Sequence, residues 1–148
     1  MDLPLKIWYC DICHEKIENP NEANVIWRKD DSDKFCDFKI VHKKTRSKGG
    51  CDDNTTYPFS LDLANFLGVN GLSALTSMLS SGIYNVYDLE KIELNSFVDL
   101  FRRCQVSYYE EARKYFSTIE TREFLGNDNE THPYYPEVLK KIIEINQN

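Results

Sequence analysis

The sequence predicts an α+β fold, with a small β-rich head over residues 1–57 and a compact bundle of short helices over residues 58–148, packed on the head as one unit. Three observations lead to this prediction. Before the polar stretch 52–58, apolar residues fall in short runs or alternate, which is typical of strands. After it, they recur at helical spacing. Four of the five cysteines also fall within the first 51 residues.

Three strands are expected in the head, over Lys6–Tyr9, Val25–Trp27 and Phe35–His42. The first two are compact aromatic or β-branched runs. The third alternates with a period of two, which predicts one shared face for a set of four side chains. That set comprises Cys36, Phe38, Ile40 and His42.

Five helices are expected in the second part, and each begins at a residue that can cap or start a helix. They cover residues 61–67 after Ser60, 71–79 after Asn70, 97–103 after Asn95, 108–119 after Ser107, and 136–145 from Pro136. Helices this short are marginal in isolation, so we expect them to pack together and onto the strands.

Composition and charge restrict the class of protein. The 148 residues carry a net charge of −6, which argues against a protein that coats nucleic acid, because such proteins need a basic surface. No apolar run is long enough for a membrane-spanning helix, so no membrane partner is expected. The first residues lack a basic segment followed by an apolar one, and we therefore expect a cytoplasmic protein.

The cysteines favour a metal site over disulfides, because their number is odd and no secretion signal is expected. Cys10 and Cys13, separated by two residues, can bend around one metal ion and supply half of a tetrahedral zinc site. The preferred ligand set adds His42 and Cys51. The alternative set uses Cys36 in place of either of these two, although a mid-strand Cys36 is also an ordinary buried thiol.

Residues 8–51 resemble the zinc-ribbon and zinc-knuckle modules, through the segment Cys10–Cys13 and a pair of late ligands that follows a strand. The resemblance implies a zinc-ribbon-like head that holds a structural Zn²⁺ ion. Segments 67–79 and 106–116 are similar to parts of small uncharacterised bacterial or phage proteins, to which no function attaches.

Other interpretations of the cysteine pair are weaker. Together with His14, the segment Cys10–Cys13 also matches the c-type haem attachment motif. Covalent haem attachment, however, requires export of the protein and a further ligand to the haem iron. A redox-active Cys-x-x-Cys pair would lie at the start of a helix. A catalytic zinc ion would keep one coordination position open for water or substrate, whereas four protein ligands fill every position. The remaining alternative is a set of reduced thiols without metal.

The expected function is that of a small non-enzymatic interaction protein, an adaptor or inhibitor, with zinc stabilising its fold. No catalytic residue is assigned. Its partner is expected to be a protein that contacts an acidic, aromatic surface, because exposed tyrosines often anchor interfaces. Each of two tyrosine doublets, 108–109 and 134–135, is expected to turn one ring to the core and one to solvent.

Two alternative functions use other residues. Residues 39–51 hold five basic side chains and no acid, which predicts either a solvated loop or an anion-binding one. A nucleic-acid-binding regulator would use Lys43, Lys44, Arg46 and Lys48. An enzyme would use the zinc ion or the loop that contains His132.

Overall fold

The structure is a computed structural model that describes residues 5–44, 49–79, 91–126 and 132–148. It is an α+β fold, and its elements divide between two compact units, Lys6–Gln105 and Val106–Asn148. None of the helices within the described ranges is long and apolar enough to cross a membrane.

Two antiparallel sheets form the β part of the first unit. The strands are β1 (Trp8–Tyr9), β2 (Lys16–Ile17), β3 (Ala23–Lys29), β4 (Phe35–His42) and β5 (Phe59–Asp62). β1 pairs with β2, and the larger sheet has the order β4-β3-β5. The expected strands at 25–27 and 35–42 are therefore present, the second with the predicted bounds.

The expected helix over residues 61–67 is wrong. Its first residues belong to β5, where Phe59 lies opposite Trp27 and Leu61 opposite Val25. Only Leu63–Phe66 turn into a helix, the short 3-10 helix η2. Pairing with β3 and stacking of Phe59 on Trp27, with ring centroids 6.0 Å apart, prevail over the local helical spacing.

β4 contains a bulge that changes which side chains share a face. Ile26 lies opposite Lys39, but Arg28 lies opposite Cys36, so β4 holds one extra residue between these two pairs. Asp37 in this segment has a φ of 58°, in the left-handed region that aspartate tolerates better than most residues.

The bulge separates Cys36 from His42. Cys36 is opposite Arg28 and His42 is opposite Ala23. Arg28 and Ala23 are five positions apart on a strand whose side chains alternate, so they and their partners point to opposite faces. The expectation that Cys36 and His42 share one face is therefore wrong.

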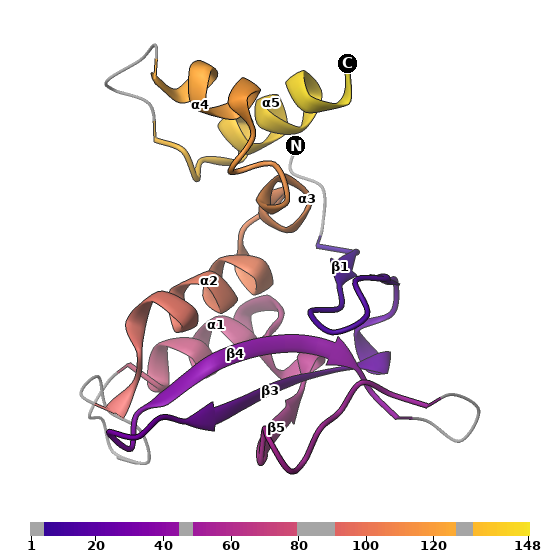
Figure 1. Ribbon diagram of the computed structural model, residues 1–148, viewed down its shortest axis with the longest axis vertical. Coiled ribbons are helices and arrows are strands. Elements are labelled where there is room, and N and C mark those ends of the chain that lie inside the picture. Colours follow the sequence, from indigo (N-terminus) through magenta and orange to yellow (C-terminus); the bar gives the residue numbers. More distant parts are fainter. Residues whose placement is uncertain (1–4, 45–48, 80–90, 127–131) are drawn as a thin grey trace. The chain divides into compact units, whose positions relative to one another are not determined.

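Helices α1 (Gly68–Ser77) and α2 (Leu94–Gln105) lie on one face of the larger sheet (Figure 1). The ring of Phe97 from α2 meets that of Phe38 from β4 edge to face, with centroids 5.5 Å apart, and Phe97 is fully buried. α2 begins close to the predicted start. Its first turn is capped by the Glu93 carboxylate, which accepts hydrogen bonds from the backbone N–H groups of Asn95 and Ser96.

The second unit contains α3 (Tyr109–Arg113), α4 (Ile119–Gly126) and α5 (Pro136–Gln147). The single helix expected over 108–119 is wrong, because α3 ends at Arg113. α5 begins at Pro136 as predicted. The fully buried cluster of this unit consists of Tyr109, Ala112, Leu139 and Ile142.

Candidate metal centre

Four side chains from three separate segments converge at one end of the first unit. Cys10, Cys13, His42 and Cys51 each offer one ligand atom, and these atoms all lie within 4.8 Å of one another. In a tetrahedral zinc site with Zn–S bonds of about 2.3 Å, ligand atoms are about 3.5–3.8 Å apart. Small side-chain movements would therefore bring the four atoms onto one ion.

The turn after β1 places the first two sulfur atoms. The Cys10 N–H group donates to the Glu15 carbonyl, and the His14 N–H group donates to the Cys10 carbonyl, both at 2.9 Å. His14 has a φ of 65°, which reverses the chain directly after Cys13. The two hydrogen bonds close a tight turn and keep both cysteines on one side of it.

The two later ligands are held side by side by the backbone. His42 is the last residue of β4. The Cys51 N–H group donates to the His42 carbonyl at 2.8 Å, so the chain returns to the end of the strand it has just left. This contact brings together two candidate ligands that are nine positions apart in the sequence.

The orientation of the His42 ring suits metal binding through Nδ1. Its Nε2 atom is 3.3 Å from the Lys16 carbonyl oxygen, and its Nδ1 atom is 3.3 Å from the Cys13 sulfur. A carbonyl oxygen can only accept a hydrogen bond, so Nε2 carries the proton and donates a hydrogen bond to the Lys16 carbonyl. Nδ1 is then left with the lone pair that a metal needs.

The cysteine thiols differ in acidity. Burial acts to raise the pKa of Cys10, but hydrogen bonds from the backbone N–H groups of Cys13 and Ile12 lower it to about 7. Burial and the neighbouring thiols of Cys10 and Cys13 raise the pKa of Cys51 to about 12. A divalent cation supplies the positive charge that allows several thiolates to coexist at such short range.

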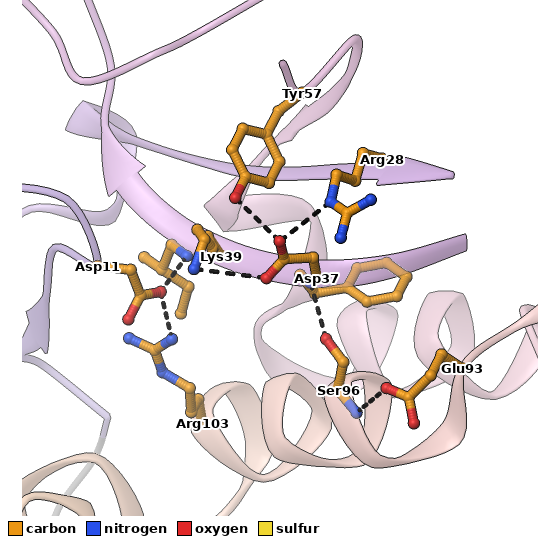
Figure 2. Close-up of polar contacts among 10 residues, drawn as sticks. Asp11, Arg28, Asp37, Lys39, Tyr57, Glu93, Ser96 and Arg103 are labelled. Atoms are coloured by element: carbon orange, nitrogen blue, oxygen red, sulfur yellow. Dashed lines mark hydrogen bonds and ion pairs between the residues drawn. The ribbon is translucent and has the colours of Figure 1, made fainter. Parts of the chain in front are cut away.

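A network of polar contacts anchors the Cys10–Cys13 turn to the rest of the unit (Figure 2). The Asp11 Oδ2 atom accepts from Arg103 Nη1 at 2.6 Å and from the Ile40 N–H group at 2.7 Å. Arg103 also donates to the Tyr9 carbonyl at 3.0 Å, and only 1% of this residue is exposed. Asp11 and Arg103 were not singled out from the sequence, because nothing local links residues 92 positions apart.

Three of the four candidate ligands, Cys13, His42 and Cys51, line a cavity of about 760 Å³. Cys13 is exposed and His42 and Cys51 are half-buried, whereas Cys10 is buried at 1% exposure. The cavity is lined by Cys13, Glu15, Lys16, Ile17, Glu18, Glu22, His42, Lys43, Gly49 and Cys51.

The other cysteines lie outside this cluster. Cys36 is six residues from His42 along β4, a distance of about 20 Å at the usual rise per strand residue. Cys104 is fully buried in α2. The structure thus brings together the preferred ligand set and does not bring Cys36 to it.

The basic segment is only partly described, since Arg46 and Lys48 lie outside the described residues. Lys43 Nζ is 2.9 Å from Asp62 Oδ1, and Lys39 Nζ is 3.4 Å from Asp37 Oδ1. His132 precedes α5, and its ring stacks on that of Tyr135 with centroids 4.7 Å apart.

Comparisons with protein-family models, with curated proteins and with solved structures found no match to this chain. The interpretation of the site therefore depends on its geometry and on the chemistry of its side chains.

Proposed function

We propose that this chain binds one structural Zn²⁺ ion through Cys10, Cys13, His42 and Cys51, and that the zinc-stabilised protein acts by binding a partner protein, as an adaptor or inhibitor. The observation that carries the proposal is the convergence of the four ligand atoms within 4.8 Å. Three soft thiolates and one imidazole are a donor set typical of structural zinc.

The role of the ion is structural in this proposal because four protein ligands complete a tetrahedral shell. A catalytic zinc keeps a position for water or substrate, and no such position remains once all four side chains bind. The ion would join the turn after β1, the end of β4 and the segment that precedes β5. Its binding energy would then contribute to folding directly.

Exposed aromatic side chains support a protein partner. Tyr134 and Tyr135 are 39% and 51% exposed, although only one ring of this doublet was expected to face solvent. In the other doublet Tyr109 is buried and Tyr108 is half-buried. A tyrosine ring offers a large contact area at little cost in conformational entropy, which makes it a frequent interface anchor.

The nucleic-acid alternative has less support. Lys43 and Lys39 already face the carboxylates of Asp62 and Asp37, so a phosphate group would have to compete with these ion pairs. The net charge of −6 adds long-range repulsion to this local competition.

The zinc content of the purified protein tests the proposal. We expect one zinc ion per chain by elemental analysis, and a melting temperature that falls when a chelator removes it. Cys10→Ser and His42→Ala should lose the ion. The matched control Cys104→Ser, which alters a buried thiol away from the cluster, should keep it.

Two results would contradict the ligand assignment. One is a protein without bound metal that melts at the same temperature with and without chelator. The other is loss of metal in Cys36→Ser with retention in His42→Ala. For the partner, Tyr135→Ala should weaken binding of the identified protein without changing the zinc content or the melting temperature.

A further inference from the structure

We propose that Cys13 is an oxidation site, at which a peroxide forms a disulfide between Cys13 and a neighbouring cysteine of the cluster and thereby releases the metal ion. The inference depends on the zinc site proposed above and adds to it a specific chemistry, reversible control of metal binding by oxidants.

Access favours Cys13 over the other four cysteines, all of which lie in the described part of the chain. It is the one exposed cysteine, and it lines the cavity of about 760 Å³ beside the metal centre. Cys10, Cys36 and Cys104 are 1%, 7% and 0% exposed. A small neutral oxidant in the cavity would therefore meet the Cys13 sulfur before these three.

Two thiols that can form a disulfide with an oxidised Cys13 lie next to it. The sulfur atoms of Cys10 and Cys51 lie within 4.8 Å of its own, so a disulfide needs a local movement and no unfolding. A thiol with a resolving partner at this range is the usual arrangement of a reversible redox sensor.

Oxidation of the cluster proceeds in two steps and consumes one hydrogen peroxide molecule. The Cys13 thiolate attacks one oxygen of hydrogen peroxide, the O–O bond breaks, and a sulfenic acid and hydroxide form. A second thiolate attacks the sulfenic sulfur, the S–O bond breaks, and a second hydroxide leaves. With two protons from solvent, two thiolates and one peroxide yield one disulfide and two waters. Only His42 and one cysteine remain as ligands, too few to retain the ion.

The experiment treats the zinc-loaded protein with hydrogen peroxide and follows metal release with a chromogenic chelator. We expect one zinc ion released per disulfide formed, with Cys13 in the disulfide-linked peptide by mass spectrometry. Addition of a reductant and zinc should restore the metal content. The double variant Cys36→Ser/Cys104→Ser is the matched control, and it should release zinc at the wild-type rate.

Cys13→His tests the role of the thiol itself, because imidazole replaces the sulfur as a ligand but forms no disulfide. It should bind zinc and release it at least roughly tenfold more slowly under peroxide. Should this variant fail to bind zinc, alkylation of the wild-type holoprotein with limiting iodoacetamide gives an independent readout, with Cys13 labelled first.

The inference is overturned if peroxide oxidises Cys36 or Cys104 before Cys13, or if oxidation at Cys13 leaves the zinc bound. It is also overturned if the double variant no longer releases zinc. A wild-type protein that contains no zinc before treatment would instead refute the proposed function, so the two failures are distinguishable.

Discussion

Asp11 lies between the two cysteines of the first turn, but its carboxylate binds groups outside that turn. It accepts from the Arg103 side chain and from the Ile40 backbone, and its own N–H group donates to the Ile40 carbonyl at 2.9 Å. These contacts, which involve none of the candidate ligand side chains, fix the turn against β4 and α2. Preorganisation of this kind lowers the entropy cost of gathering ligands.

Arg103→Met is therefore expected to weaken zinc binding although Arg103 is not a ligand. The variant leaves the Asp11 carboxylate without its buried cation, and outer partners of this kind typically change metal affinity by about 10–100-fold. Competition with a chelator of known affinity measures the effect. Arg122→Met, at an exposed position of α4, is the control and should bind zinc as wild type does. Equal affinities in both variants would refute the positioning role.

Glu111 illustrates the cost of a poorly solvated carboxylate. Its Oε2 atom is buried and has no hydrogen-bond partner among the described residues. Burial and the nearby Glu110 raise its pKa above the usual value for glutamate. A raised pKa in the folded state means that ionisation of Glu111 opposes folding, and this penalty appears as pH rises from about 4.3 through the folded-state pKa.

Glu111→Gln should therefore raise the free energy of unfolding at pH 7, by up to about 1 kcal/mol because the half-buried group is partly screened by solvent. The gain should vanish below about pH 3, where the carboxyl is protonated in both states. Urea denaturation at the two pH values tests this, and a variant that is less stable than wild type at pH 7 would contradict it.

Among the elements, β4 is the one that organises the first unit. Its bulge contains Asp37, whose carboxylate accepts from Arg28 Nε at 3.1 Å and from the Tyr57 hydroxyl at 3.0 Å (Figure 2). Its outer edge is covered by side chains, since the Phe38 N–H group donates to Ser96 Oγ at 2.8 Å and the Ile40 N–H group donates to Asp11. Such capping protects an edge strand from pairing with another chain.

Asp37→Asn is expected to lower the free energy of unfolding at pH 7 by about 1 kcal/mol, since asparagine tolerates the positive φ but weakens both hydrogen bonds. Burial acts to raise the pKa of Asp37, but the bonds from Arg28 and Tyr57 outweigh it and the pKa is lowered. The stabilisation is thus complete above the unfolded value of about 3.9 and is lost as pH falls through the folded-state pKa.

Thermal melts of Asp37→Asn and wild type from pH 7 down to pH 2 measure this dependence. The two curves should converge at the acid end. Curves that run parallel over the whole range would mean that the charge of Asp37 does not stabilise the bulge.

The elements differ in how far the sequence predicts them. The period of two in 35–42 and the proline at the start of α5 are local signals, and both elements are present. β5 was missed because its pairing with β3 is non-local and its spacing also fits a helix. The break after Arg113 was missed because residues 114–118 include no glycine or proline. They continue as tight turns, in which the N–H groups of Tyr115 and Phe116 donate to the carbonyls three residues earlier. The four metal-ligand candidates follow from residue type and spacing, but the contact between Asp11 and Arg103 is purely tertiary.

At the scale of the whole chain, each of the two compact units has its own source of stability. In Lys6–Gln105 the candidate ligands come from three segments of the chain, so a metal ion bound as proposed would contribute to the folding of that unit. The unit Val106–Asn148 has its own buried cluster, in which Tyr109 and Ala112 from α3 meet Leu139 and Ile142 from α5. It contains none of the candidate ligands.

Under the proposed function, removal of zinc should destabilise the chain unevenly. Native-state hydrogen exchange with and without chelator tests this, because it reports the opening free energy of each segment separately. We expect chelation to accelerate exchange at the Asp11, Ile40 and Cys51 N–H groups, which hold the ligand segments together. Exchange in α5 should change little. Equal acceleration throughout would mean that the two units unfold as one, and no acceleration at Asp11 or Ile40 would mean that the turn is held by Arg103 without the ion.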